Sequence, residues 1–339
     1  MTSSSPASHE NFGGPAQKFA ERMMALHASV HLQPSVVTLL VLFFCVYAGY
    51  RSGDFWSGLN WQLLSQPLAE AGLVSIGMMF VIASGGIDLS VGAIVGVAAV
   101  AAGIAAHRGL SVPAIEAVAL SAGLLCGAFN GLLIGVLRLS AILVTLGTMI
   151  LFSGVALAIS AGSSFSDFPN GLLWWNDATL VGVPVEFLLF LATAAAAAIL
   201  LRYTLWGHYV IAAGSNRVAA RYSGHPVALT LFCVYALQGL LCGIASILLV
   251  ARLASARADM GQGLMLMAIA AVVLGGAPIA GGSASVIATV VGVAAFYIVQ
   301  DGLLLLDVPP FVQHAFTSVL LLVSVATGNL LRGNGEGRR

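Results

Sequence analysis

Charged residues are scarce in this chain of 339 residues. They make up 8% of the sequence, whereas hydrophobic residues make up 59%, and the mean hydropathy is +1.00. A soluble domain is roughly a quarter charged, so this chain has too few polar side chains to cover a surface that faces water. The composition predicts a protein that is solvated mainly by lipid. The formal net charge of zero gives no reason to expect a nucleic acid as a partner.

Lysine is nearly absent, and Lys18 is the single one in the chain. A P-loop needs a lysine in the pattern G-x-x-x-x-G-K-[ST] to reach the phosphates of a nucleotide, and Lys18 lies in Gln-Lys-Phe. The chain therefore has no Walker A site, and another subunit or an ion gradient must supply any energy that its function requires. The sequence also lacks G-x-S-x-G and H-E-x-x-H, which argues against an intramembrane enzyme.

Cysteine is sparse too, and no pair has the spacing of a zinc site or of a disulfide framework. All four cysteines lie inside apolar runs, where we expect them to pack between helices. We therefore expect no metal and no cofactor. A cleavable signal peptide is not evident either, because residues 1–34 contain Ser, Gly and His but no apolar h-region. We interpret residues 1–34 as a cytoplasmic N-terminal tail.

What the sequence has in abundance is long apolar runs. A transmembrane helix needs about 20 mostly apolar residues to cross about 30 Å of hydrocarbon. The sequence predicts an all-α fold, a polytopic transmembrane helix bundle over residues 35–331, followed by a cytoplasmic tail at 332–339. About ten spans are expected, near 35–50, 62–84, 90–106, 112–136, 141–161, 184–201, 228–250, 264–280, 284–300 and 311–331.

The distribution of basic residues predicts the orientation, because cytoplasmic loops are enriched in Lys and Arg. With ten spans both termini lie on one side. That side holds nine basic residues, Lys18, Arg22, Arg138, Arg202, Arg217, Arg221, Arg332, Arg338 and Arg339. The other side holds four, Arg51, Arg108, Arg252 and Arg257. We therefore expect both termini in the cytoplasm.

Several polar residues lie inside the predicted spans. Gln62, Gln66 and Glu70 recur at four-residue spacing, so they share one face of a helix. Polar side chains are expensive in lipid, so this face is expected either to line a solute path or to form hydrogen bonds between helices. The same two interpretations apply to three single residues in other spans, Asn130, Thr145 and Thr148.

The segment 84–92 reads Ser-Gly-Gly-Ile-Asp-Leu-Ser-Val-Gly and interrupts two apolar runs. Asp88 or Ser90 is expected to cap the helix that follows, where free N–H groups favour an acceptor. The alternative is direct contact with a solute, since an acid near membrane depth is often functional. Gly85 and Gly86 allow a sharp reversal of the chain between packed helices.

The stretch 202–227 is the longest predicted cytoplasmic connection and carries three arginines. Asn216 is expected to cap a short helix over Arg217–Tyr222, which Gly224 then ends. A helix at the membrane surface can dock into a groove of a partner protein. The alternative is an ordinary basic loop that maintains the topology.

Four segments together resemble the permease subunits of bacterial ribose/xylose/galactoside-type ABC sugar importers, over about residues 35–330. They are Ser84–Gly92 with Gly85, Gly86, Asp88, Ser90 and Gly92; Thr145–Met149; Gly207–Gly224; and Ile269–Gly282 with Gly275, Gly276, Gly281 and Gly282. The sequence differs at Met265 and Met267, where relatives carry an acidic Glu-Leu-Asp triplet. This difference leaves the class of cargo open.

The resemblance implies a subunit in the bacterial inner membrane that moves a monosaccharide or a similar polyol, with ATP hydrolysed by a partner chain. It implies ABC ATPase subunits, a periplasmic or lipid-anchored solute-binding protein, and a second permease chain in a homo- or heterodimer. The residues expected to couple to the ATPase are Asn216, Arg217, Arg221 and Gly224. As an alternative, the same machinery would import a nucleoside, an autoinducer-like furanosyl compound or an amino acid. A different class, an ion-coupled secondary transporter, also fits the missing P-loop.

Overall fold

Apolar runs become helices throughout the computed structural model, which describes residues 38–39, 41–309, 311–313, 315 and 318–319. The predicted tails 1–34 and 332–339, and most of the predicted span 311–331, lie outside the described residues. In the described part, six helices are long and apolar enough to cross a membrane. They are α2 (Gly58–Ala83), α4 (Val112–Gly131) continued by the π-helix η1 (Leu132–Val136), α5 (Ala141–Ser160), α7 (Val185–Tyr203), α10 (Val227–Leu253) and α12 (Val286–Leu305).

Three apolar helices are shorter, and they coincide with three of the other predicted spans. They are Val41–Arg51, α3 (Val91–His107) and α11 (Leu264–Leu274). The prediction of a span over 264–280 was too long, because α11 ends at Leu274 and Gly276 then takes a left-handed φ of 89°. The all-α transmembrane bundle is confirmed, and the total of ten spans stays a prediction.

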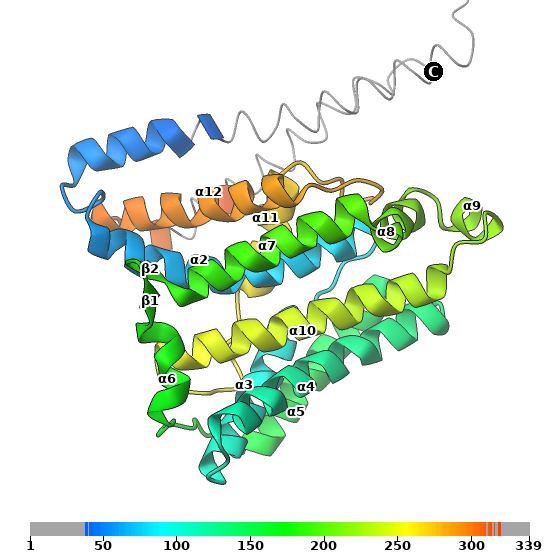
Figure 1. Ribbon diagram of the computed structural model, residues 1–339, viewed down its shortest axis with the longest axis horizontal. Coiled ribbons are helices and arrows are strands. Elements are labelled where there is room, and N and C mark those ends of the chain that lie inside the picture. The colour runs from blue at the N-terminus through cyan, green and yellow to red at the C-terminus, as the bar shows by residue number, and fades with distance from the viewer. Residues whose placement is uncertain (1–37, 40, 310, 314, 316–317, 320–339) are drawn as a thin grey trace, which may run out of the picture.

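The long helices α2, α4, α5, α7, α10 and α12 run roughly along one common direction (Figure 1). α2 lies at the centre and packs against α7, α10, α11 and α12, and almost all of its residues from Leu64 onward are buried. α10 packs against α4 on its other side, and α3 packs against α4 and α5. Only 28% of the 18-residue apolar stretch of α5 and 22% of that of α7 is buried inside the bundle. A nearly enclosed central helix inside an apolar shell is the arrangement expected of a protein that lipid surrounds.

α4 and α10 pack through glycine. Gly123, Gly127 and Gly131 recur at four-residue spacing on α4, and a Cβ at any of them would collide with the backbone of α10 between Phe232 and Gly243. Small residues at this spacing let two transmembrane helices approach closely. The spacing is visible in the sequence and indicates a close helix contact, but it does not identify α10 as the partner.

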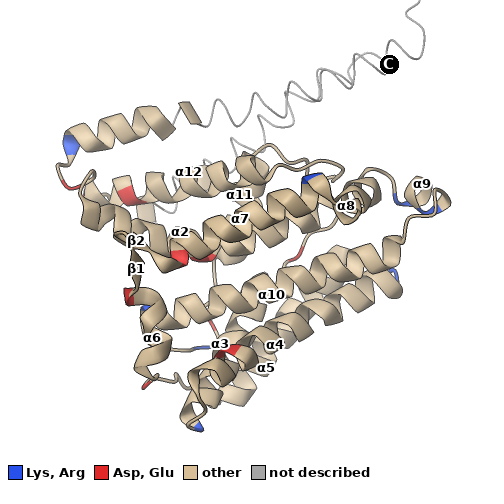
Figure 2. Ribbon diagram, in the orientation of Figure 1, with Lys and Arg blue, Asp and Glu red and all other residues tan. Residues whose placement is uncertain are grey.

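The two ends of the bundle differ. One end carries α6 (Asn170–Asp177) and a hairpin of β1 (Thr179–Leu180) with β2 (Val183–Pro184). The opposite end carries α8 (Leu205–Ser215) and α9 (Arg217–Tyr222). Figure 2 shows basic residues around α9, and most acidic residues nearer the end with α6. Within the connection 202–227, the sequence predicted α9 but not α8, which makes residues 205–215 helical as well.

Candidate functional site

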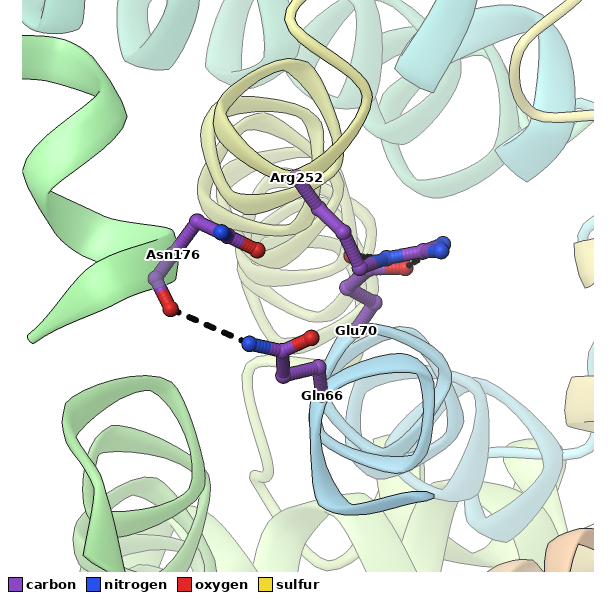
Figure 3. A network of polar contacts seen from close by, with 4 residues as sticks. All are labelled: Gln66, Glu70, Asn176 and Arg252. Atoms are coloured by element: carbon purple, nitrogen blue, oxygen red, sulfur yellow. Dashed lines mark hydrogen bonds and ion pairs between the residues drawn. The ribbon is translucent and has the colours of Figure 1, made fainter. Parts of the chain in front are cut away.

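Two polar side chains of α2 reach across to neighbouring elements near the end that carries α6. Gln66 donates from Nε2 to the carbonyl oxygen of Asn176 at 3.0 Å. Glu70 accepts two hydrogen bonds from Arg252 of α10, at 2.7 Å from Nε and 2.8 Å from Nη2. Figure 3 shows both contacts. The Glu70 side chain is 3% exposed, so this bidentate ion pair links α2 to α10 inside the bundle.

The predicted polar face of α2 is thus real, and Gln62 lies half-buried one turn before Gln66. The contacts of Gln66 and Glu70 match the interpretation of hydrogen bonding between helices. A role in a solute path stays a prediction for all three residues. Arg252, which the sequence placed outside the spans, lies in the last turn of α10 and compensates the charge of Glu70.

Sequence reasoning overlooked a second buried acid beside this pair. Glu186 lies in the first turn of α7 and is 0% exposed. Both of its carboxyl oxygens lack a hydrogen-bond partner in the described part of the chain. It interacts electrostatically with Glu70 and with Arg252. The signal was present in the sequence, because Glu186 is an acid inside the predicted span 184–201, and an ionisable residue in a span marks a functional candidate.

The turn between α2 and α3 is built around Asp88, which is fully buried. Asp88 accepts at Oδ1 from the backbone N–H of Ser90 at 2.8 Å and from the Ser90 hydroxyl at 2.6 Å. Ser90 is the N-cap residue of α3, but its side chain makes no capping hydrogen bond. The expected cap is therefore not formed, because neither side chain accepts from an N–H group inside α3; Asp88 instead fixes Ser90, the residue that precedes the helix.

Asn130 and Thr145 connect neighbouring helices to this turn. Asn130 of α4 donates from Nδ2 to the Ser90 hydroxyl at 2.8 Å. Thr145 of α5 donates to the carbonyl oxygens of Ile87 at 3.2 Å and of Ala141 at 2.8 Å. Thr148 donates to the carbonyl of Thr145 at 3.4 Å. These contacts fit the packing interpretation, and a place for the three residues in a solute path stays a prediction.

Four glycines from three segments meet at the other end of α2, and we call them the glycine junction: Gly85, Gly214, Gly281 and Gly282. The Gly282 N–H donates to the carbonyl of Ala83 at 3.0 Å. A Cβ on Gly281 would lie 2.6 Å from the Gly85 Cα, and a Cβ on Gly214 would lie 2.7 Å from the Gly282 nitrogen. The turn after α2, the end of α8 and the segment before α12 therefore touch through their backbones.

The remaining motif glycines also mark close approaches. A Cβ on Gly92 would lie 2.5 Å from the Gly261 carbonyl oxygen, and a Cβ on Gly275 would lie 2.5 Å from that of Ala288. Gly86 has no left-handed φ, so Gly85 alone, with φ 75°, supplies the reversal predicted for the pair. The motifs of the sequence are thus largely packing contacts between helix ends.

α9 is directly connected to the glycine junction. Asn216 caps α9 as the sequence predicts, since its Oδ1 accepts from the N–H groups of Val218 at 3.0 Å and Ala219 at 2.9 Å. Arg217 donates from Nη2 to the carbonyl of Gly85 at 3.1 Å and to that of Ser84 at 3.4 Å. Arg221 is exposed, and Gly224 follows α9 with φ 81°. The two arginines therefore face different surroundings, Arg217 the end of α2 and Arg221 the outside of the bundle.

Comparison with known proteins gives the chain a family. The family model described as "Branched-chain amino acid transport system / permease component" matches residues 68–325. The chain is 36% identical over 260 residues to the "Autoinducer 2 import system permease protein LsrD" of Photorhabdus luminescens, covering 75% of this chain and 78% of the relative. It is 37% identical over 260 residues to the protein of the same name in Escherichia coli, covering 75% and 79%. No solved structure matches the chain.

Proposed function

Because the chain belongs to the family of branched-chain amino acid transport system permease components, we propose that it is the transmembrane permease subunit of a binding-protein-dependent ABC importer. The similarity to permeases of an autoinducer 2 import system, over 75% of the chain, is the observation that carries this proposal. It favours an autoinducer-like furanosyl compound as the cargo over a plain monosaccharide. Met265 and Met267, in place of acids, agree with a cargo that differs from those of the sugar importers.

The ATPase is proposed to bind at α9. α9 lies at the end of the molecule, its residues Val218, Arg221 and Tyr222 are exposed, and Asn216 fixes its start. A short exposed helix of this kind presents a rigid surface to a partner. Arg217 then connects α9 to the end of α2, so a displacement of α9 would move the central helix.

The orientation proposed for the chain places α9 in the cytoplasm and α6 with the β1–β2 hairpin on the outer side. The positive-inside pattern supports this orientation, as does the position of α9 at one end and of the hairpin at the other. The solute-binding protein would then deliver its cargo near α6, close to Gln66 and Glu70. The exposed apolar faces of α5 and α7 are available to lipid or to a second permease chain.

Copurification tests the proposal. The tagged chain is expressed in its own host, extracted in detergent, and the proteins that accompany it are identified by mass spectrometry. We expect a chain with a Walker A motif, and we expect cells that carry the importer to deplete autoinducer 2 from the medium. Recovery of no such chain, together with uptake that collapses when an uncoupler removes the ion gradient, would favour the ion-coupled secondary transporter.

A further inference from the structure

The carboxyl group of Glu186 is buried and receives no hydrogen bond from the part of the chain that the structure describes. It is 0% exposed, and neither of its oxygens accepts a hydrogen bond from any residue that the structure describes. A buried polar group of this kind is costly unless something bonds to it. Inside a membrane bundle, ionisable residues that persist at such a cost mark the routes of solutes and ions. The question is therefore which chemical group would bond to Glu186.

Arg252, the cation that interacts with Glu186, is already hydrogen-bonded to Glu70. Arg252 gives both Nε and Nη2 to Glu70, and the charges of these two residues compensate each other. Glu186 interacts electrostatically with both residues, so the group as a whole carries one excess acid. A hydrogen-bond donor that enters from outside the chain would satisfy it.

The position of Glu186 fits the entry of a solute. Glu186 lies two residues beyond the β1–β2 hairpin, in the first turn of α7. Glu70 comes from α2 and Arg252 from α10, and α2 packs against both α7 and α10. Gln66 lies one turn from Glu70 and contacts α6. Three helices that pack together thus bring two carboxyls, a guanidinium and an amide to the end that we propose to face outward.

We propose that Glu186 is a solute-binding residue of the permease, which accepts hydrogen bonds from the hydroxyl groups of a polyol-like furanosyl cargo. This inference rests on the proposed function and deepens it. The carboxyl group of Glu186 offers two oxygens with lone pairs, and two neighbouring hydroxyls of a polyol supply donors to them. Glu186 is enclosed in the state described here, so the cargo reaches it when α2, α7 and α10 move apart.

The metal-ion alternative has less support, because no group of three or more His, Cys, Asp or Glu side chains could hold an ion within the described residues. A carboxyl that lacks further oxygen or nitrogen ligands is a poor cation site, but it is a sufficient acceptor for hydroxyls.

The test compares three variants in cells that express the whole importer, with uptake of autoinducer 2 as the probe. Glu186→Gln replaces one acceptor oxygen by a donor, and the apparent KM is expected to rise about tenfold, as the loss of one hydrogen bond implies. Glu186→Leu removes the carboxyl, so uptake is expected to be lost while the Tm of the purified protein stays equal or rises. Glu116→Gln is the control, because Gln keeps the oxygen that accepts from Trp175 Nε1; it should leave KM and Tm unchanged.

The outcomes separate the inference from the proposed function. A wild-type KM in both Glu186 variants would show that the residue does not bind cargo. A fall in Tm in the Leu variant, with uptake lost in proportion to folded protein, would show a structural role instead. The inference would also be overturned if uptake by the wild type depended on added Na⁺ and the Glu186→Gln variant took up cargo with the same KM and rate as the wild type. Failure of the proposed function is detected separately, because no ATPase chain would then copurify with the wild-type permease.

Discussion

Arg252 interacts with two buried carboxyl groups, and one of them, Glu70, is bonded to it. Removal of the cation therefore has a different consequence from removal of its partner. Arg252→Gln leaves Glu70 and Glu186 together without a positive charge, and the loss of one partner of a buried ion pair costs about 3–5 kcal/mol. Glu70→Gln leaves Arg252 with Glu186 as a second acceptor. We expect Arg252→Gln to lower the Tm in detergent more than Glu70→Gln does, as measured by tryptophan fluorescence.

The double variant is the matched control for that comparison. Glu186→Gln should recover part of the Tm that Arg252→Gln loses, because it removes one of the two uncompensated acids. Equal losses for Arg252→Gln and Glu70→Gln, or no recovery in the double variant, would show that Glu186 and Arg252 do not interact.

Asp88→Ala removes the acceptor of two hydrogen bonds from Ser90, and leaving a buried donor without its acceptor costs about 1–3 kcal/mol. Asp88→Asn keeps an oxygen at the Oδ1 position, where both bonds end. We therefore expect a lower yield of folded protein for Asp88→Ala than for Asp88→Asn, measured by size-exclusion chromatography after extraction. An Asp88→Ala variant that elutes with wild-type yield would contradict this role.

Individual contacts could be predicted from the sequence to the extent that they are local. Asn216 caps a helix that begins at the next residue, and Asp88 accepts hydrogen bonds from a residue two positions later. Residues adjacent in the sequence therefore predict both contacts. Glu70 and Arg252 lie 182 positions apart, and no local pattern relates them. Glu186 is an intermediate case, because its presence in a predicted span was visible but its lack of a donor depends on the packing of α2, α7 and α10.

Among the elements, α9 separates two roles that the sequence assigned together. Arg221 is exposed and is proposed to contact the ATPase, whereas Arg217 is bonded to the end of α2. Arg221→Glu is expected to reduce the amount of ATPase recovered with the permease severalfold. Arg217→Gln is expected to leave that recovery unchanged but to lower the solute moved per ATP hydrolysed, because α9 is no longer connected to α2. The amount of ATPase per permease and the amount of solute moved per ATP hydrolysed can both be measured in proteoliposomes.

Each variant serves as the control of the other. Loss of ATPase recovery with Arg217→Gln would show that this side chain supports docking itself, and undiminished transport per ATP would show that the bonds to Ser84 and Gly85 transmit nothing. Helix α9 and its ends could be predicted because capping obeys local rules. α8 could not, because its apolar residues resemble those of the neighbouring spans.

For the whole molecule, the proposed orientation predicts which surfaces are reachable from each side of the membrane. Val181 at the tip of the β1–β2 hairpin is 96% exposed and Val218 on α9 is 64% exposed. A membrane-impermeant maleimide applied to intact spheroplasts should label Val181→Cys and leave Val218→Cys unlabelled until the membrane is permeabilised. The wild-type chain is the control, since Cys45 and Cys242 are buried and Cys126 and Cys233 half-buried. The reverse pattern would invert the orientation and place α9 away from any cytoplasmic ATPase.

The overall architecture was the most predictable level, because apolar length and the cost of charge in lipid depend on composition alone. Helix boundaries were less predictable where glycine ends a helix inside an apolar run, as at Leu274. The order in which helices pack depends on contacts such as that of Gly127 with the backbone of α10, which only the folded chain brings together.

The glycine junction has a consequence for the rate at which the permease changes state. Where side chains interdigitate, two segments can shift past each other only after rotamers change and packing is broken, and this raises an activation barrier. At Gly85, Gly214 and Gly281 backbone lies against backbone, and the Ser215 hydroxyl beside Gly282 is a short side chain, so few side chains must first move out of the way. A small displacement at this end of α2 therefore meets little steric resistance, and an alanine at Gly214 would slow each transport cycle even in a chain that still folds.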